Sequence, residues 1–229
     1  MRPFDNRQQA GHLLAERLAS EDLTPPVVVL ALPRGGVPVA AEVARRLGAP
    51  LDLLFVRRIG APWHREYAVA AVVDGKDPQI VVDPSSRAAG ADPDYIASEA
   101  ATELLEIERR RQVYLRGRAS VELAGTTAIV VDDGIATGHT MSAAIKALRK
   151  RGVASIILAV PVAPHSTVIA LRSQCDRLIC LAEPEPFDAV GLHYADFHQV
   201  SDDEVIAALD ALTAVPPVVE PEALPFAGV

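Results

Sequence analysis

The chain has 229 residues, 50% of them hydrophobic, and a mean hydropathy of +0.20, which is enough apolar content for one sizeable core. Disorder is excluded for the bulk of the chain. The net charge of −8 and the 4% aromatic content argue against a nucleic-acid partner, although they leave room for a local basic patch. No apolar run reaches the roughly 20 residues of a membrane span, and no signal peptide is visible. Cys175 and Cys180 read as reduced thiols, so we expect a cytoplasmic protein without membrane contact.

Short apolar runs rich in Val, Ile and Leu recur along the chain without polar alternation. This pattern is typical of strands buried on both faces, and therefore of a parallel sheet. Helical patterns alternate with the runs, the clearest of them at 36–47 and around 141–148. The alternation predicts an α/β fold, a Rossmann-like parallel sheet flanked by helices. The predicted strands are 27–32, 51–56, 128–131, 155–160 and 177–182.

Two segments interrupt this alternation. Several Gly and Pro residues surround two short apolar runs in 57–94, which predicts a flexible loop and hairpin with little to anchor it. A long helix is expected over 93–117, and its ERRR run at 108–111 reads as a solvated face. The Pro-rich segment 214–229 is expected to be an extended arm. We therefore predict a single domain over 1–213, followed by this tail.

The strongest functional signal is the segment 128–141, AIVVDDGIATGHTM. A buried strand ends in Asp132 and Asp133 and then turns through Gly and Thr residues into a helix. Ligands of open α/β sheets bind at the carboxyl ends of strands, and a turn that opens a helix offers free N–H groups to a phosphate. The two carboxylates can accept hydrogen bonds from sugar hydroxyls, or hold Mg²⁺ or its waters. Together these features describe a site for a ribose 5-phosphate.

This stretch resembles the signature of the type I phosphoribosyltransferases, enzymes that use phosphoribosyl pyrophosphate (PRPP). An ordinary strand-to-helix connection with chance acids does not explain Thr137, Gly138 and Thr140 together. The resemblance covers roughly 5–212 and implies the type I phosphoribosyltransferase fold, with a flexible hairpin and a small hood at about 183–200. It also implies catalytic and ribose-binding roles for Asp132 and Asp133, which would bind Mg²⁺ directly or through water. The 5′-phosphate would lie on Ala136, Thr137, Gly138, His139 and Thr140.

A second match, ALPRGG at 31–36, ends the first predicted strand. In the family this loop holds pyrophosphate and contains a non-proline cis peptide bond, which here would be Pro33–Arg34. Glycines that tolerate unusual dihedral angles follow it. Alone the motif is weak, because a surface arginine before a turn is commoner, and its spacing ahead of the acids gives it weight. The resemblance assigns the pyrophosphate to Pro33, Arg34, Gly35 and Gly36.

The third match, VRRIGAP at 56–62, ends the second predicted strand. In the family a basic residue here contacts pyrophosphate, and the following loop closes over the reacting centre. Arg57 and Arg58 are both candidates, with Arg58 favoured as the catalytic residue. The other arginine would then be an ordinary solvated side chain.

The segment 186–197 resembles the hood, which reads the acceptor base. Phe187, Val190, Tyr194 and Phe197 are the candidate acceptor contacts, and core packing is an equally open interpretation for each aromatic ring. Where family members that act on 6-oxopurines carry a carboxylate, this chain has Ala136. That departure puts hypoxanthine, guanine and xanthine in doubt as acceptors.

The resemblance implies a phosphoribosyltransferase that moves the 5-phosphoribosyl group from PRPP to a nitrogenous base or similar acceptor and releases pyrophosphate. Mg²⁺ is the implied cofactor, and a homodimer is the expected assembly. Two other functions use the same site: a PRPP-sensing regulator without enzymatic activity, and a hydrolase or phosphorylase of phosphoribosyl compounds. The sequence does not identify the acceptor.

Overall fold

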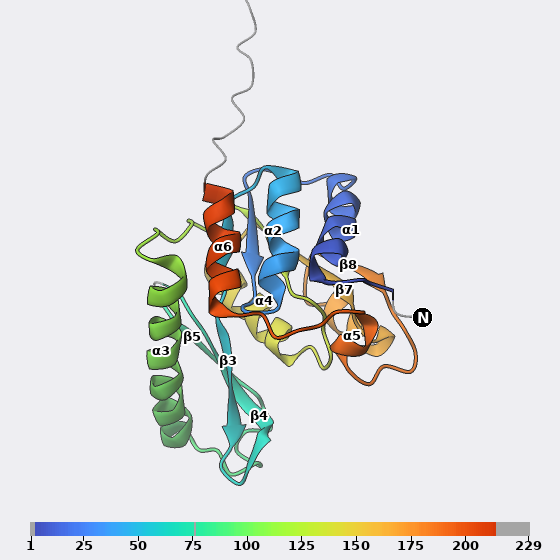
Figure 1. The fold of residues 1–229 in the computed structure, drawn as a ribbon. Coiled ribbons are helices and arrows are strands. Elements are labelled where there is room, and N and C mark those ends of the chain that lie inside the picture. The colour runs from blue at the N-terminus through green and yellow to red at the C-terminus, as the bar shows by residue number, and fades with distance from the viewer. Residues whose placement is uncertain (1–2, 76, 214–229) are drawn as a thin grey trace, which may run out of the picture.

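A five-stranded parallel sheet forms the centre of the chain in the computed structural model, which describes residues 3–75 and 77–213 (Figure 1). The strand order is β2-β1-β6-β7-β8, and every neighbouring pair is parallel. The α/β fold expected from the sequence is therefore confirmed. The strands are β1 (Val27–Ala31), β2 (Leu51–Leu53), β6 (Thr127–Val131), β7 (Ser155–Val162) and β8 (Arg177–Ala182).

Both faces of this sheet are buried, as the unbroken apolar runs predict. Successive residues of β6 point to opposite faces, so Ile129 and its neighbour Val130 belong to different apolar clusters. Helices α1 (Arg7–Ala19), α2 (Gly36–Leu47) and α6 (Asp202–Thr213) lie side by side on one face (Figure 1). Helices α4 (His139–Lys150) and α5 (His165–Arg172) cover the other face.

The segment expected as a loop and hairpin is a three-stranded antiparallel sheet. It contains β3 (Val56–Ala61), β4 (His64–Val73) and β5 (Gln79–Val82) in that spatial order. The expectation of little apolar content is wrong, because Ile59, Val69 and Val72 are buried in the same cluster as residues of α3 (Pro93–Leu115). The predicted strand 51–56 is divided between β2 and β3, which belong to different sheets. The connecting residues Leu54 and Phe55 are apolar and buried, so the sequence shows one continuous apolar run there.

Helix α3 is fixed to the base of this antiparallel sheet by a buried ion pair. Arg111 pairs with Asp74, which is 3% exposed and also accepts the N–H of Phe55 over 3.0 Å. The interpretation of the ERRR run as a solvated face is therefore wrong for Arg111. Arg109, in the same run, pairs at the surface with Glu106. Helical spacing places these neighbouring arginines on different faces of α3.

The hood pairs with the N-terminal end of the chain. It contains the short 3₁₀ helix η1 (Val190–His193), and a parallel bridge joins Phe4 to Tyr194. The N–H of Ala195 donates to the carbonyl of Phe4 over 2.8 Å. Within the described ranges, no helix combines the length and the apolarity needed to cross a bilayer. The predicted arm at 214–229 lies outside the described residues.

Candidate active site

The two predicted binding loops meet where the strand order of the main sheet reverses. The chain passes from β1 to β2 on one side, whereas β7 and β8 follow β6 on the other. Ala31 and Val131 are register partners at the ends of β1 and β6, and the N–H of Leu32 donates to the carbonyl of Val131 over 3.0 Å. Such a switch point is the usual ligand site of an open α/β sheet. The fold thus brings the segments 31–36 and 132–140 together.

Two glycines let the first loop pass directly over the acids. The Pro33–Arg34 peptide bond is cis, which confirms the prediction. A Cβ on Gly35 would collide with Oδ2 of Asp133, and one on Gly36 would lie 2.7 Å from the carbonyl oxygen of Val131. Gly35 has ordinary helical dihedral angles, φ −57° and ψ −37°. Close approach, rather than the unusual dihedral angles expected, therefore requires glycine here.

The backbone donors of this loop are fewer than the resemblance implies. Pro33 has no N–H, and the N–H of Gly36 already donates to the carbonyl of Leu32 over 3.0 Å. Within the described chain, no protein acceptor takes the N–H of Arg34 or Gly35. These two groups are therefore the ones available to an anion.

The Arg34 side chain is held at the mouth of the loop by α6. Its Nη1 donates to Oδ1 of Asp202 over 3.2 Å, and the hydroxyl of Tyr114 donates to the same oxygen over 2.7 Å. These contacts lower the pKa of Asp202, so that carboxylate stays ionised opposite Arg34. The rest of the guanidinium fork can meet a second anion, because Arg34 is only partly covered.

Asp132 and Asp133 form a pair of neighbouring carboxyls in a largely buried position. The N–H of Asp133 donates to Oδ1 of Asp132 over 2.9 Å. Burial raises the pKa of Asp132 well above its ordinary value, and the charge of Asp133 raises it further. Burial also raises the pKa of Asp133, but hydrogen bonding to Arg7 opposes that shift. The first proton is therefore lost more easily from Asp133, which keeps its negative charge beside Arg7.

Arg7 was not singled out from the sequence, yet it lies within this site. Its Nε donates to Oδ2 of Asp133 over 2.8 Å, and its Nη1 donates to the carbonyl of His198 over 2.8 Å. Its guanidinium carbon lies 3.7 Å from the centre of the Phe197 ring. Arg7 directly follows Asn6, the N-cap of α1. No local sequence pattern connects this arginine with the distant acids.

The predicted phosphate turn leads into the first turn of α4. Gly138, the N-cap, has φ +78°, a left-handed conformation that suits glycine. The first N–H groups of a helix have no intrahelical acceptor, so those at the start of α4 can meet a phosphate. The turn is braced from α5, since the hydroxyl of Thr167 donates to the carbonyl of Ala136 over 2.7 Å. Thr137 and His139 are exposed.

The two candidate arginines of the third match lie on β3 rather than at the end of β2. The Nε of Arg57 donates to Glu103 of α3 over 2.7 Å. Arg58 is exposed, and no ion pair holds it within the part of the chain that the structure describes. Neither arginine lines the cavity beside the acids. Of the two, Arg58 is free to approach a ligand.

The hood residues pack mainly on one another. Tyr194 is 1% exposed and its hydroxyl donates to the carbonyl of Asp133 over 2.5 Å, so its ring has no face free for an acceptor. Phe187 stacks on His193 with ring centres 4.9 Å apart. Val190 packs against the strand-end turn, with its Cγ1 2.5 Å from where a Cβ on Gly134 would be. Core packing is thus the better interpretation for Tyr194.

A cavity of about 360 Å³ lies between the first loop, the acids and the end of the hood. Phe197 is the one predicted hood residue that lines it, whereas the phosphate turn lies outside its lining. The volume is in the range of small-molecule sites. The lining residues are Arg7, Arg34, Gly35, Asp132, Asp133, Phe197, His198, Gln199 and Val200.

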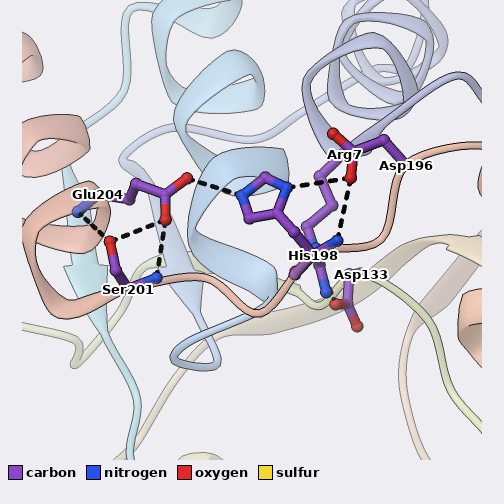
Figure 2. A network of polar contacts seen from close by, with 6 residues as sticks. All are labelled: Arg7, Asp133, Asp196, His198, Ser201 and Glu204. Atoms are coloured by element: carbon purple, nitrogen blue, oxygen red, sulfur yellow. Dashed lines mark hydrogen bonds and ion pairs between the residues drawn. The ribbon is translucent and has the colours of Figure 1, made fainter.

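His198 lies at the rim of this cavity between two carboxylates (Figure 2). Its Nε2 contacts Glu204 at 2.8 Å, and its Nδ1 contacts Asp196 at 3.1 Å. These contacts raise its pKa above the ordinary value. No motif in the sequence marks His198 or Glu204 as neighbours of the site.

The carboxylates of Asp132 and Asp133 are too few to enclose Mg²⁺, so an ion bound there would keep several of its water ligands. Mg²⁺ in enzymes is commonly held by one or two carboxylates together with substrate phosphates. Asp132 and Asp133 offer carboxylates next to the predicted pyrophosphate loop. Among the described residues, no group of three or more His, Cys, Asp or Glu could form an all-protein cage. The residues therefore fit a metal that arrives with the substrate.

Comparisons with known proteins agree with this geometry. The family model of the phosphoribosyl transferase domain matches residues 5–196. Two Mycobacterium tuberculosis proteins named as phosphoribosyl transferases, MT0597 of strain CDC 1551 and Rv0571c of strain H37Rv, are each 44% identical over 211 residues. That alignment covers 92% of this chain and 47% of each relative, so the chain spans about half their length.

The solved structure of the protein TT1426 from Thermus thermophilus is 42% identical to this chain. It aligns with a TM-score of 0.80 over 91% of this chain and 98% of that one. The likeness therefore extends over nearly the whole of this chain. With the family match extending over most of the domain, this chain belongs to the phosphoribosyl transferase family of type I.

Proposed function

We propose that this protein transfers the 5-phosphoribosyl group from PRPP to a nitrogenous base or similar acceptor and releases pyrophosphate. The observation that supports this most is the meeting, at the switch point of the sheet, of the Arg34 loop with the acids that precede the phosphate turn. One loop offers donors for pyrophosphate, and the other offers carboxylates for ribose hydroxyls and a helix start for the 5′-phosphate.

In the proposed reaction a nitrogen of the acceptor forms a bond to ribose C1 while the bond from C1 to the pyrophosphate oxygen breaks. Positive charge develops on the sugar ring, and negative charge develops on the leaving group. Arg34 and the N–H groups of Arg34 and Gly35 stabilise that negative charge from fixed positions. Asp132 and Asp133 orient the ribose through its hydroxyls. A bound Mg²⁺ supplies further positive charge at the pyrophosphate.

Arg58 completes the pyrophosphate site when the antiparallel sheet moves toward it. Its exposed side chain, free of ion pairs in the described chain, supports this role over that of Arg57. The turn between β3 and β4 contains only Pro62 and Trp63. Closure is therefore a movement of the hairpin as a unit, and not the folding of a long loop.

The acceptor is proposed to be a base other than a 6-oxopurine. Ala136 is exposed at the start of the phosphate turn and carries no carboxylate for a purine ring nitrogen. Phe197 is the predicted hood residue that lines the cavity, which supports it as the acceptor contact.

The test follows pyrophosphate release with PRPP and Mg²⁺ against a panel of purine, pyrimidine and pyridine bases. We expect release that depends on one acceptor and that falls in Arg34→Gln, with Arg46→Gln as a control. Arg46 pairs with Glu16 at the surface, between α2 and α1. Tight PRPP binding without release from any base indicates the regulator instead. Release that needs no acceptor indicates hydrolysis.

A further inference from the structure

Arg7 connects three parts of the molecule that are far apart in the sequence. It begins α1, ion-pairs with Asp133 at the end of β6, and donates to the carbonyl of His198 in the segment that leads to α6 (Figure 2). Its side chain is 9% exposed, and that of Asp133 is 13% exposed. A guanidinium this buried needs hydrogen-bond acceptors for its N–H groups, because an unpaired buried charge is costly.

The same arginine also covers an aromatic face of the hood. Its guanidinium lies over Phe197, and the Phe197 ring packs on Tyr194 with centres 5.1 Å apart. Tyr194 in turn donates to the backbone carbonyl of Asp133. The hood is therefore attached to Asp133 twice, once through the Tyr194 hydroxyl and once through Arg7.

We propose that Arg7 is a positioning residue of the active site: it fixes the orientation of the Asp133 carboxylate for the ribose and holds the 194–198 segment of the hood against it. The part that concerns ribose rests on the proposed function. The part that concerns the hood does not, because it describes contacts of the free protein.

The geometry requires arginine rather than any cation. Nε reaches the carboxylate while Nη1 reaches the His198 carbonyl, and the planar fork stacks on Phe197. A lysine ammonium can restore the positive charge beside Asp133, but it cannot make these three contacts together. One oxygen of Asp133 is bound by Arg7, which fixes the orientation of the carboxylate.

The experiment compares Arg7→Met, Arg7→Lys and the matched control Arg17→Met in the full chain. Arg17 lies on the same helix, with a half-exposed side chain that pairs with Glu21. Hydrogen exchange of 190–198 is measured without ligand, alongside the melting temperature. PRPP affinity is then measured by calorimetry. These two readouts separate the two parts of the proposal.

In Arg7→Met we expect faster exchange confined to the hood and PRPP affinity lower by about ten- to a hundredfold, the range for a lost charge-assisted bond. Arg7→Lys recovers part of the affinity but not the hood protection, and Arg17→Met behaves as the parent. Exchange that accelerates evenly over the whole chain, or hood exchange equal to the parent, overturns the proposal. If the parent binds no PRPP, the proposed function fails, and the exchange result still decides the role of Arg7 in the hood.

Discussion

Asp132 and Asp133 are adjacent, yet the structure predicts different outcomes when each is replaced by asparagine. The pKa of Asp132 is raised by burial and by Asp133, so the folded protein binds its proton more tightly than the unfolded chain does. Stability therefore falls as pH rises from the unfolded pKa of about 3.9 toward the folded pKa. Asp132→Asn removes this fall. We expect an unchanged or higher melting temperature at neutral pH and PRPP affinity lower by about ten- to a hundredfold.

Asp133→Asn instead removes the charge that faces the buried guanidinium of Arg7. A loss of about 1–3 kcal/mol of stability is expected, together with weaker PRPP binding. Thermal unfolding across pH and PRPP titration of both variants provide the comparison. Equal PRPP binding by the parent and both variants would show that these carboxylates do not hold the ribose.

His198 gives the site a pH dependence of its own. Its contacts with Glu204 and Asp196 raise its pKa, and the pKa of Glu204 falls to about 2 through the N–H of Ser201 and the His198 ring. The stabilisation from charged His198 is complete below the unfolded pKa of about 6.5 and disappears as pH rises through the higher folded pKa.

An NMR titration of the His198 ring is expected to give a midpoint above about 6.5 in the parent. In Glu204→Gln the midpoint falls toward that value, because the strongest partner has lost its charge. Glu108→Gln, on α3, is the control and leaves the midpoint in place. A midpoint of His198 that is the same in Glu204→Gln as in the parent would contradict the contact between these two side chains.

At the scale of the elements, the antiparallel sheet depends on its attachment to α3. Arg111→Met leaves Asp74 buried without its ion-pair partner, and losing one member of a buried pair costs about 3–5 kcal/mol. Arg109→Met is the matched control, because Arg109 is 61% exposed and pairs with Glu106 on the same helix. Its effect on unfolding by denaturant is expected to be within about 0.5 kcal/mol. Similar losses for both variants would show that the Asp74 contact is unimportant.

The strands of the main sheet could be predicted because burial on both faces produces continuous runs of Val, Ile and Leu in the sequence. The helix predicted over 36–47 has the observed bounds, and Pro38 lies in its first turn, where a missing N–H is tolerated. The antiparallel sheet was predicted less well. Its β4 runs from exposed His64 to buried Val73, so half of the strand carries no apolar signal. The surrounding Gly and Pro residues then favoured a loop.

The candidate site was predictable where its residues are consecutive. Asp132 to Thr140 and Pro33 to Gly36 form motifs, and the fold brings them together. Arg7 and the partners of His198 come from three separate elements, and nothing local in the sequence connects them. Tyr194 could not be distinguished from an acceptor contact, because burial of an aromatic ring depends on what packs over it.

At the scale of the molecule, the proposed closure of the hairpin can be tested with a single side chain. Trp63 is the one tryptophan in the sequence, and it is 93% exposed at the turn between β3 and β4. Its fluorescence therefore reports on this turn alone. Saturating PRPP is expected to shift the emission to shorter wavelength and to reduce quenching by acrylamide, because a closed hairpin shields the ring. Quenching that PRPP leaves unchanged would count against closure.

The pairing of Phe4 with Tyr194 has a consequence for the order in which the protein is assembled. During synthesis, β1, β6 and β7 leave the ribosome before the hood does, so the sheet can form while Arg7 still has no His198 carbonyl to bind. Contacts between such distant residues form late, because closing a long stretch of chain is entropically costly. A nascent chain that ends before the hood therefore has both binding loops but an unfinished cavity. The lining of the cavity is complete only when the domain is nearly complete.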